Sequence, residues 1–266
     1  MARIISGIIP NRRLRRQVRD SLRGTETGRT DGIVDVLLEY PLIVSYAQFA
    51  EDIVLHKYLH YIENGFYVDV GAADPVKMSV TKLFYDRGWS GINIEPRYDA
   101  IDLYRELRPR DINLAVGVSD HQGTAEFYVS GENSTLDMTG AQRQGFGDAI
   151  TIELDLLGNI LAKHAQPVVH FLKIDVENHE KEVLAGMNFS LVRPWIIAME
   201  STIPDTDLAN YSQWEDILLE KRYSLLTRHH INRYYVAEEK KDELMGKALK
   251  KVRYIRIGDY QKLIPK

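Results

Sequence analysis

A repeated alternation of short apolar runs with helical runs between residues 65 and 118 constrains the fold of this chain most strongly. The apolar runs cover 65–70, 91–96 and 111–118, and the helical runs between them cover 79–89 and 101–109. Strands that alternate with helices usually pair in parallel, because each helix carries the chain back to the start of the sheet. The sequence therefore predicts an α/β fold built around a parallel sheet.

The same alternation is predicted to continue on both sides of this region. The further expected elements are a helix at 45–62, a strand near 124–129, a helix at 153–164, a strand at 168–176, a helix at 177–186, a strand at 194–201, a helix at 211–222, a hairpin over 223–236, a helix at 237–251 and a strand at 253–257. Residues 130–150 show no regular period and predict a long loop over the sheet edge. A loop of this length inside a compact domain is more often functional than not.

Composition and charge argue against several classes of protein. The chain has no cysteine, which excludes disulfides, a thiolate nucleophile and cysteine-held metal sites. Its net charge of −4 argues against a general nucleic-acid binder, which is usually strongly basic. No apolar run reaches the roughly 18–20 residues that a membrane-spanning helix needs, so we expect a cytoplasmic protein.

The N-terminal segment differs in charge from the rest of the chain. Residues 1–30 hold eight arginines and only two acidic residues. We expect residues 1–40 to form a basic arm or linker with helical content, ahead of a single α/β domain over residues 41–266. Two interpretations of the arm stay open: a solvated linker, or a basic helix that contacts the inner face of a membrane or a protein partner.

Acidic residues recur at the carboxyl ends of the predicted strands. They and their small neighbours are Asp69, Gly71 and Asp74 after the first strand, Glu95 after the second, Ser119 and Asp120 after the third, Asp175 and Glu177 after the fourth, and Glu200 at the fifth. In an open parallel sheet, ligands bind at the carboxyl ends of the strands. One rim of the sheet is therefore predicted to be lined with carboxylates.

The turn after the first strand indicates which ligand such a rim would bind. A dinucleotide site needs the G-x-G-x-x-G pattern, whereas this turn reads GAADPV and places acids where a pyrophosphate would sit. Glu95 follows Asp69 at close to the ~20-residue offset at which an acid takes ribose hydroxyls. A cationic nucleoside without phosphate fits this pattern, and S-adenosylmethionine is such a molecule.

The chain resembles the FkbM family of class I S-adenosylmethionine-dependent methyltransferases. The resemblance rests on YAQFAED (46–52), GFYVDVGAADP (65–75), RGWSGINIEP (87–96), NSTL (133–136), FLKIDVENHEKEVLAGM (171–187) and RPWIIAMEST (193–202). It implies a Rossmann-like fold with a mostly parallel seven-stranded sheet, a C-terminal antiparallel hairpin and flanking helices. The chain departs from the family at Asn178, where the family usually has glycine.

The resemblance also implies roles for individual residues. The implied cofactor-binding residues are Asp69, Gly71, Ala72 and Asp74 around the methionine, Glu95 at the ribose, Ser119 and Asp120 near the adenine, and Gln48 and Asp52 closing over it. Ser134 and Thr135 would lie between the cofactor and the acceptor. Asn232 and Arg233, just after the predicted hairpin turn, could hold sugar hydroxyls or could be ordinary turn residues.

Methyl transfer to a hydroxyl requires alignment and removal of a proton, and the candidate catalytic residues are Asp175, Glu177 and His179. Asp175 and Glu200 could share Mg²⁺ or another divalent metal, since two carboxylates are enough for magnesium. His179 could instead act as the base. The alternatives stay open that Asp175 caps the following helix, that Glu177 only complements its dipole, and that His179 is a surface residue.

The predicted activity is O-methylation of a sugar hydroxyl on a glycan, nucleotide sugar or glycosylated metabolite, in a setting such as surface-polysaccharide biosynthesis. The family resemblance also allows a non-sugar acceptor such as a polyketide hydroxyl or a phosphorylated group. A non-catalytic nucleoside-binding module is the rival from another class. A homo-oligomer is compatible with all of these interpretations.

Overall fold

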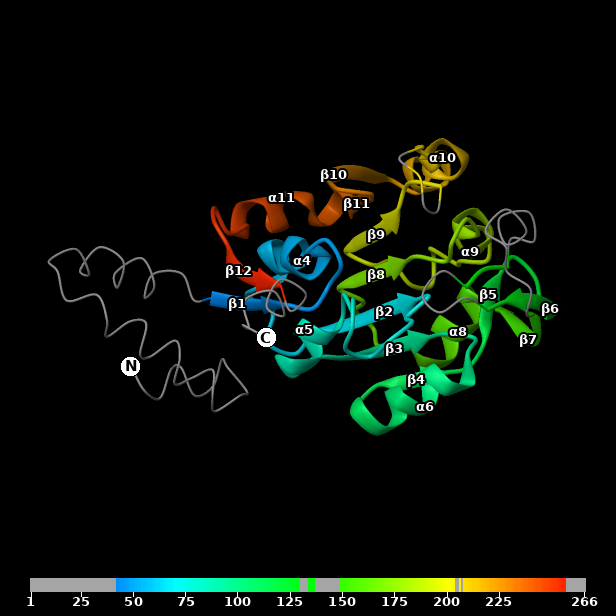
Figure 1. The fold of residues 1–266 in the computed structure, drawn as a ribbon. Helices are drawn as coiled ribbons and strands as arrows, with labels where there is room; N and C mark the ends of the chain where they lie inside the picture. Colours follow the sequence, from blue (N-terminus) through cyan, green and yellow to red (C-terminus); the bar gives the residue numbers. More distant parts are fainter. Residues whose placement is uncertain (1–41, 130–133, 137–148, 204–205, 207, 257–266) are drawn as a thin grey trace, which may run out of the picture. The chain divides into compact units, whose positions relative to one another are not determined.

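A computed structural model describes residues 42–129, 134–136, 149–203, 206 and 208–256 of the chain (Figure 1). The chain divides into two compact units. The larger unit is residues 46–248. The smaller unit combines residues 1–45 with residues 249–266, and each unit is described by itself below.

A mixed seven-stranded sheet forms the centre of the larger unit (Figure 1). Its strands, in spatial order, are β10 (Tyr223–His229), β11 (Asn232–Ala237), β9 (Ile196–Glu200), β8 (Phe171–Ile174), β2 (Phe66–Val70), β3 (Ser90–Ile94) and β4 (Ile112–Leu114). The five strands from β9 to β4 are parallel, whereas β11 runs antiparallel to both of its neighbours. The prediction of an α/β fold is confirmed, and the 223–236 hairpin is present as β10 and β11.

The central strands are apolar along nearly their whole length because helices cover both faces of the sheet. On one face, Val68, Ile92 and Leu172 belong to the main hydrophobic core. The helices that add buried side chains to this core are α8 (Leu157–His164), α9 (Glu180–Ala185) and α10 (Glu215–Glu220). On the other face, the ring of Phe171 stacks on Tyr67 and contacts Phe84 of α5 (Lys82–Asp86).

The region around residue 117 differs from the prediction. The segment expected as one strand over 111–118 divides into β4 and β5 (Gly117–Ser119). β5 leaves the central sheet and pairs in parallel with β7 (Ala149–Leu156), which also pairs antiparallel with β6 (Gly123–Tyr128). The helix expected from residue 153 therefore begins at Leu157, because residues 149–156 alternate polar and apolar side chains with the period of two that a strand requires.

Several helices begin or end at other residues than predicted. α4 (Glu51–Leu59) begins after Ala50, whose φ of +64° interrupts a helix expected from residue 45. α6 (Tyr98–Leu107) begins earlier than expected, α11 (Glu238–Lys247) ends earlier, and α10 follows a short 3₁₀ turn at Tyr211–Gln213. The helix expected from residue 177 begins at Glu180, so Asp175 is not its N-cap residue.

The smaller unit contains a two-stranded parallel sheet. β1 (Leu42–Ser45) pairs with β12 (Arg253–Arg256), and β1 was not predicted. The basic arm at residues 1–40 lies outside the described residues, as does most of the long loop over 130–150.

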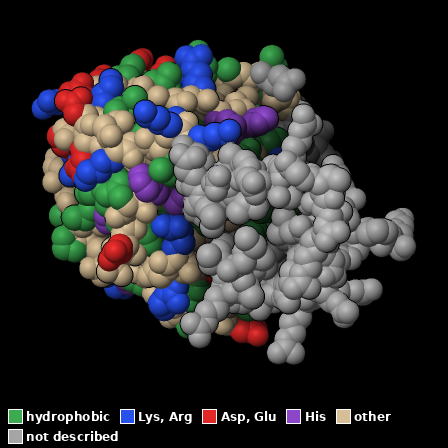
Figure 2. All heavy atoms as spheres, turned by 90° about the vertical axis from the view of Figure 1, so that its left-hand side faces the viewer, with side chains coloured by type: hydrophobic (Ala, Val, Ile, Leu, Met, Phe, Trp, Pro, Cys, Tyr) green, Lys and Arg blue, Asp and Glu red, His purple; other side chains and the backbone are tan. Residues whose placement is uncertain are grey.

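Charged side chains are mixed on the face of the molecule drawn in Figure 2. Among the described residues visible there, basic side chains lie between acidic, apolar and histidine side chains. No described helix has the length and apolar character that crossing a bilayer requires.

Candidate functional site

A cavity of about 340 Å³ lies at the carboxyl ends of β2, β8 and β9. These three strands are neighbours in the sheet, so their last residues lie side by side. Seven of the residues singled out from the sequence line this cavity, namely Gln48, Asp69, Gly71, Ala72, Asp175, Glu177 and Glu200. The described part of the chain thus brings the predicted acids of three strands to one cavity.

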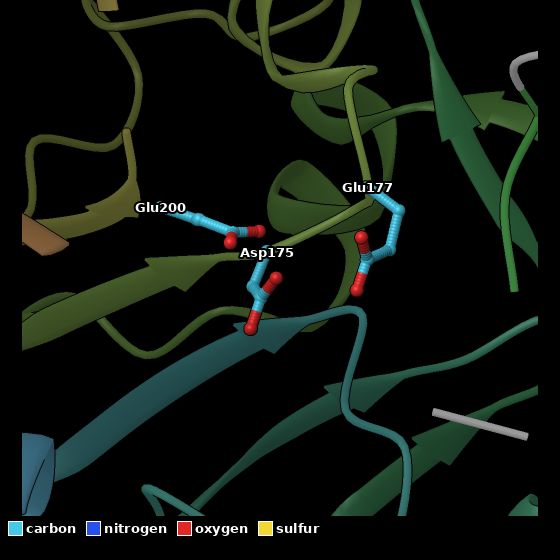
Figure 3. A group of neighbouring side chains, drawn as sticks. All are labelled: Asp175, Glu177 and Glu200. Atoms are coloured by element: carbon cyan, nitrogen blue, oxygen red, sulfur yellow. The ribbon is translucent and has the colours of Figure 1, made fainter. Parts of the chain in front are cut away.

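Three carboxylates converge in this cavity (Figure 3). Glu200 is the last residue of β9, Asp175 directly follows β8, and Glu177 lies in the turn beyond it. The register pairs Ile174 with Met199, which places Asp175 next to Glu200. One ligand atom from each of the three acids lies within 4.8 Å of the others. Such a set of carboxylate oxygens fits the preference of Mg²⁺ for hard oxygen ligands.

Burial raises the pKa of Glu200, and the neighbouring charges of Asp175 and Glu177 raise it further. The side chain is nearly inaccessible, with 7% of the residue exposed. Without a cation in the cluster, this carboxyl group keeps its proton at neutral pH. A divalent cation bound by the three carboxylates would favour the ionised form of Glu200.

Glu200→Gln is expected to stabilise the protein in the presence of a chelator, with a gain that grows with pH. Below a pH of about 4, folded and unfolded Glu200 are both protonated and the gain is small. Above it, the unfolded chain releases the proton while the folded chain, with its raised pKa, retains it, so the wild type loses stability. We expect glutamine to increase the free energy of unfolding at pH 7 by about 1–3 kcal/mol.

Urea denaturation of wild type and variant at pH 4, 5.5 and 7 checks this result. The matched control is Glu63→Gln, because Glu63 is exposed. A difference between wild type and Glu200→Gln that stays constant with pH would contradict the raised pKa.

Lys173 lies among these acids. The sequence did not reveal that its ammonium group contacts the ends of both β2 and β8. Its ammonium group donates a hydrogen bond to the carbonyl oxygen of Gly71 at 2.8 Å and pairs with Asp69 at 3.3 Å and Asp175 at 3.4 Å. Burial opposes its charge, but the two carboxylates outweigh burial and raise the pKa of Lys173 above its usual value. Lys173 therefore joins the end of β2 to the end of β8.

Gly71 makes a turn in which no other residue fits. Its φ is +75°, and a Cβ atom would lie 1.8 Å from the carbonyl oxygen of Asp175. Its amide and that of Ala72 both donate to the carbonyl oxygen of Ile94. The turn after β2 is thereby held by β3 on one side and approaches the end of β8 on the other.

The turn that carries Glu177 has an unusual backbone. Glu177 and Asn178 have φ values of +53° and +78°, and asparagine is among the few residues that tolerate this region. This explains how asparagine can replace the usual glycine. The buried carboxylate of Glu180 accepts hydrogen bonds from the amides of Val176 and Asn178. Burial, with the charge of Asp175, raises the pKa of Glu180 to about 7.

Three predicted cofactor residues lie outside the cavity lining and bind the backbone instead. Asp52 accepts from the amide of Tyr46. Asp74 accepts from two amides of its own turn, at Val76 and Lys77. Glu95 accepts from the amide of Ala73 at 3.0 Å and pairs with Arg97 at 3.1 Å. Glu95 thus supports the turn after β2 from the neighbouring strand.

Ser119, Asp120 and His179 form a separate group outside the cavity lining. The hydroxyl of Ser119 lies 3.0 Å from Nε2 of His179, and Asp120 pairs with His121 on the surface. His179 precedes α9 as its N-cap residue. The structure therefore places Asp175 and Glu177 in the cavity and His179 beside it.

The predicted acceptor residues also lie outside the cavity lining. Thr135 donates its hydroxyl hydrogen bond to the carbonyl oxygen of Glu177, which ties the short described segment with Ser134 to the cluster turn. Asn232 donates to Glu51, which does line the cavity. Arg233 is buried, pairs with Glu215 at 3.0 Å and covers the ring of Tyr211.

The fold and the site define a mixed α/β protein that has a carboxylate-lined cavity at the carboxyl edge of its sheet. A family model described as the methyltransferase FkbM domain matches residues 69–225. The chain therefore belongs to the FkbM methyltransferase family, which confirms the resemblance found in its motifs. The matched segment begins at Asp69 and includes Glu200, so it contains the acids at the ends of β2, β8 and β9. Among curated proteins, none matches this chain.

Proposed function

We propose that this methyltransferase transfers the methyl group of S-adenosylmethionine to a hydroxyl group of a sugar-type acceptor, on a class I Rossmann-like fold. The observation that carries the proposal is the single cavity in which Asp69 and Gly71 meet the carboxylates of Asp175, Glu177 and Glu200. The order of the seven strands, with β11 antiparallel near one edge, supports the fold assignment. The acidic turn after β2 supports a cationic cofactor without phosphate.

The donor set of the cavity fits the cofactor. S-adenosylmethionine, when bound, supplies a methyl group activated on a sulfonium centre. The turn at Gly71 and Ala72 would hold its methionine part. Glu95 lies outside the cavity lining, directly after the strand beside that turn, and would take the ribose hydroxyls in exchange for its contact with Arg97. Gln48, which also lines the cavity, would close over the cofactor.

The acid cluster would orient the acceptor and take up its proton. Asp175, Glu177 and Glu200 would hold a divalent cation, which lowers the pKa of a coordinated hydroxyl group. The side chain of Asp175 is more than a third exposed and borders the cavity, so we assign it the role of accepting the hydroxyl proton. His179 lies outside the lining, so we favour the metal over His179 as the device that activates the hydroxyl.

Two measurements test the function in sequence. Calorimetry with S-adenosylhomocysteine should give saturable binding, and labelled methyl from S-adenosylmethionine should then appear in one of a panel of sugars and nucleotide sugars. Chelation with EDTA should lower that transfer at least tenfold, and Mg²⁺ should restore it.

Two variants test whether methyl transfer depends on the acid cluster. Asp175→Asn should remove transfer while leaving S-adenosylhomocysteine binding within about threefold. Asp102→Asn, at an exposed position on α6, should change neither. Absence of S-adenosylhomocysteine binding would refute the cofactor assignment, and transfer that EDTA leaves unchanged would refute the metal. Transfer only to non-sugar alcohols would refute the acceptor class.

A further inference from the structure

Arg108 is a buried cation whose guanidinium donates hydrogen bonds only to neutral oxygens among the residues that the structure describes. Arg108 directly follows α6 and is completely inaccessible to solvent. Its guanidinium donates hydrogen bonds to the carbonyl oxygen of Pro75, to Oγ of Ser79 at 2.6 Å and to Oγ1 of Thr81 at 2.7 Å. Burying a charge without an opposite charge in contact is costly, so this arrangement requires a physical reason.

The hydrogen bond to Thr81 connects this arginine to the cavity. A guanidinium can only donate, so the hydroxyl of Thr81 accepts from Arg108 and its single proton is available to another group. That hydroxyl donates to Oδ2 of Asp69 at 3.2 Å. One hydroxyl group thus connects the guanidinium of Arg108 to the carboxylate of Asp69.

Asp69 is held from two sides as a result. Thr81 binds Oδ2, while Lys173 pairs with Oδ1 at 3.3 Å. The residue is 1% exposed, yet it lines the cavity. A carboxylate held at both oxygens has one orientation, which is what a preorganised binding site needs.

Arg108 also holds the loop that forms one cavity wall. Pro75 and Ser79, which accept from its guanidinium, bracket residues 76–78, and Lys77, Met78 and Ser79 line the cavity. The guanidinium lies over the ring of Tyr104, whose hydroxyl donates to the carbonyl oxygen of Ala72. Both ends of this wall are therefore connected to the same buried cation.

We propose that Arg108 is a positioning residue: through the hydroxyl of Thr81 it fixes the carboxylate of Asp69, and through Pro75 and Ser79 it fixes the adjacent wall. The consequence for ligand binding rests on the proposed function, in which the oriented Asp69 faces the cationic part of the cofactor. Arg108 itself touches neither the cavity nor a ligand. Its substitution is expected to act on the binding of the cofactor rather than on the chemical step.

Substitutions at Thr81 test this inference without removing the buried arginine. Thr81→Val keeps the side-chain shape but removes the hydroxyl, whereas Thr81→Ser keeps the hydroxyl. We expect Thr81→Val to weaken S-adenosylhomocysteine binding about tenfold in calorimetry and to speed amide hydrogen exchange over residues 69–80 in the ligand-free protein. Thr81→Ser should stay within about threefold of wild type and keep wild-type exchange.

A double-mutant cycle with Asp69→Asn tests whether Thr81 affects ligand binding through Asp69. If Thr81 acts on Asp69, Thr81→Val should weaken S-adenosylhomocysteine binding by less than about threefold in the Asp69→Asn background. A tenfold loss in both backgrounds would overturn the role of Asp69, and wild-type exchange and affinity in Thr81→Val would overturn the proposal. Failure of the wild type to bind S-adenosylhomocysteine would instead refute the proposed function. In that case the hydrogen-exchange comparison of valine with serine still decides the positioning role.

Discussion

Lys173→Met should lower the free energy of unfolding by about 3–5 kcal/mol, because it leaves the buried carboxylate of Asp69 without its cation. Asp69 is almost inaccessible and would lose the ion pair at its Oδ1 atom, while the carbonyl oxygen of Gly71 would lose its donor. For a domain of this size, 1 kcal/mol corresponds to roughly 2–4 °C in melting temperature. Urea denaturation and thermal melting of the ligand-free protein measure the loss.

A second substitution separates lost charge from lost packing. In Lys173→Met/Asp69→Asn, a neutral amide replaces the buried carboxylate of Asp69, so most of the lost stability should return. Lys173→Arg, which retains the charge, should lie between wild type and Lys173→Met. Equal stability of Lys173→Met and wild type would show that the two ion pairs contribute nothing. Failure of the double variant to recover would show that packing, not charge, is the role of Lys173.

Gly71→Ala should lower the free energy of unfolding by a similar amount, because the added Cβ atom has no space. The added Cβ atom would lie 1.8 Å from the carbonyl oxygen of Asp175, so the ends of β2 and β8 would have to separate. The positive φ of 75° adds a backbone penalty that alanine cannot avoid. Together these costs are about 3 kcal/mol or more. We also expect S-adenosylhomocysteine binding to fall at least a hundredfold, measured by calorimetry at a temperature where the variant is folded.

Gly88→Ala provides the matched control for this substitution. Gly88 has a φ of +94°, and among the described residues, its two chain neighbours aside, no heavy atom lies within 4 Å of the position that its Cβ would take. Its replacement should therefore cost only the backbone penalty, about 1–2 kcal/mol, and leave the affinity unchanged. Equal losses of stability in the two variants would show that the close approach of β2 to β8 has no energetic effect.

The sequence predicted the central strands and the position of the acids for one physical reason. A strand buried on both faces is a short apolar run, and residues that follow such runs in a parallel sheet must gather at one edge. Asp69, Asp175 and Glu200 were placed in one cavity by this argument alone. This argument does not by itself place Glu177, because the position of Glu177 depends on a turn with two left-handed residues.

The roles of Lys173 and Arg108 could not be found in this way. The partners of Lys173 lie on β2 and in the turn after β8, and only the register of the two strands brings them together. Arg108 looks like an ordinary arginine at the end of a helix, because its partners are loop oxygens some 30 residues earlier in the chain. Asp74 was predicted to bind the cofactor, but its carboxylate accepts hydrogen bonds from two amides of its own turn. The position of an acid at a strand end does not distinguish this structural role from ligand binding.

The three acids of the cluster and Lys173 come from one uninterrupted stretch, the βαβ unit over residues 171–200. The groups proposed to bind the cation and receive the proton could thus be transferred between relatives as one continuous segment of the chain. A chimera that transplants this stretch would carry the whole cluster into a relative by recombination at only two junctions.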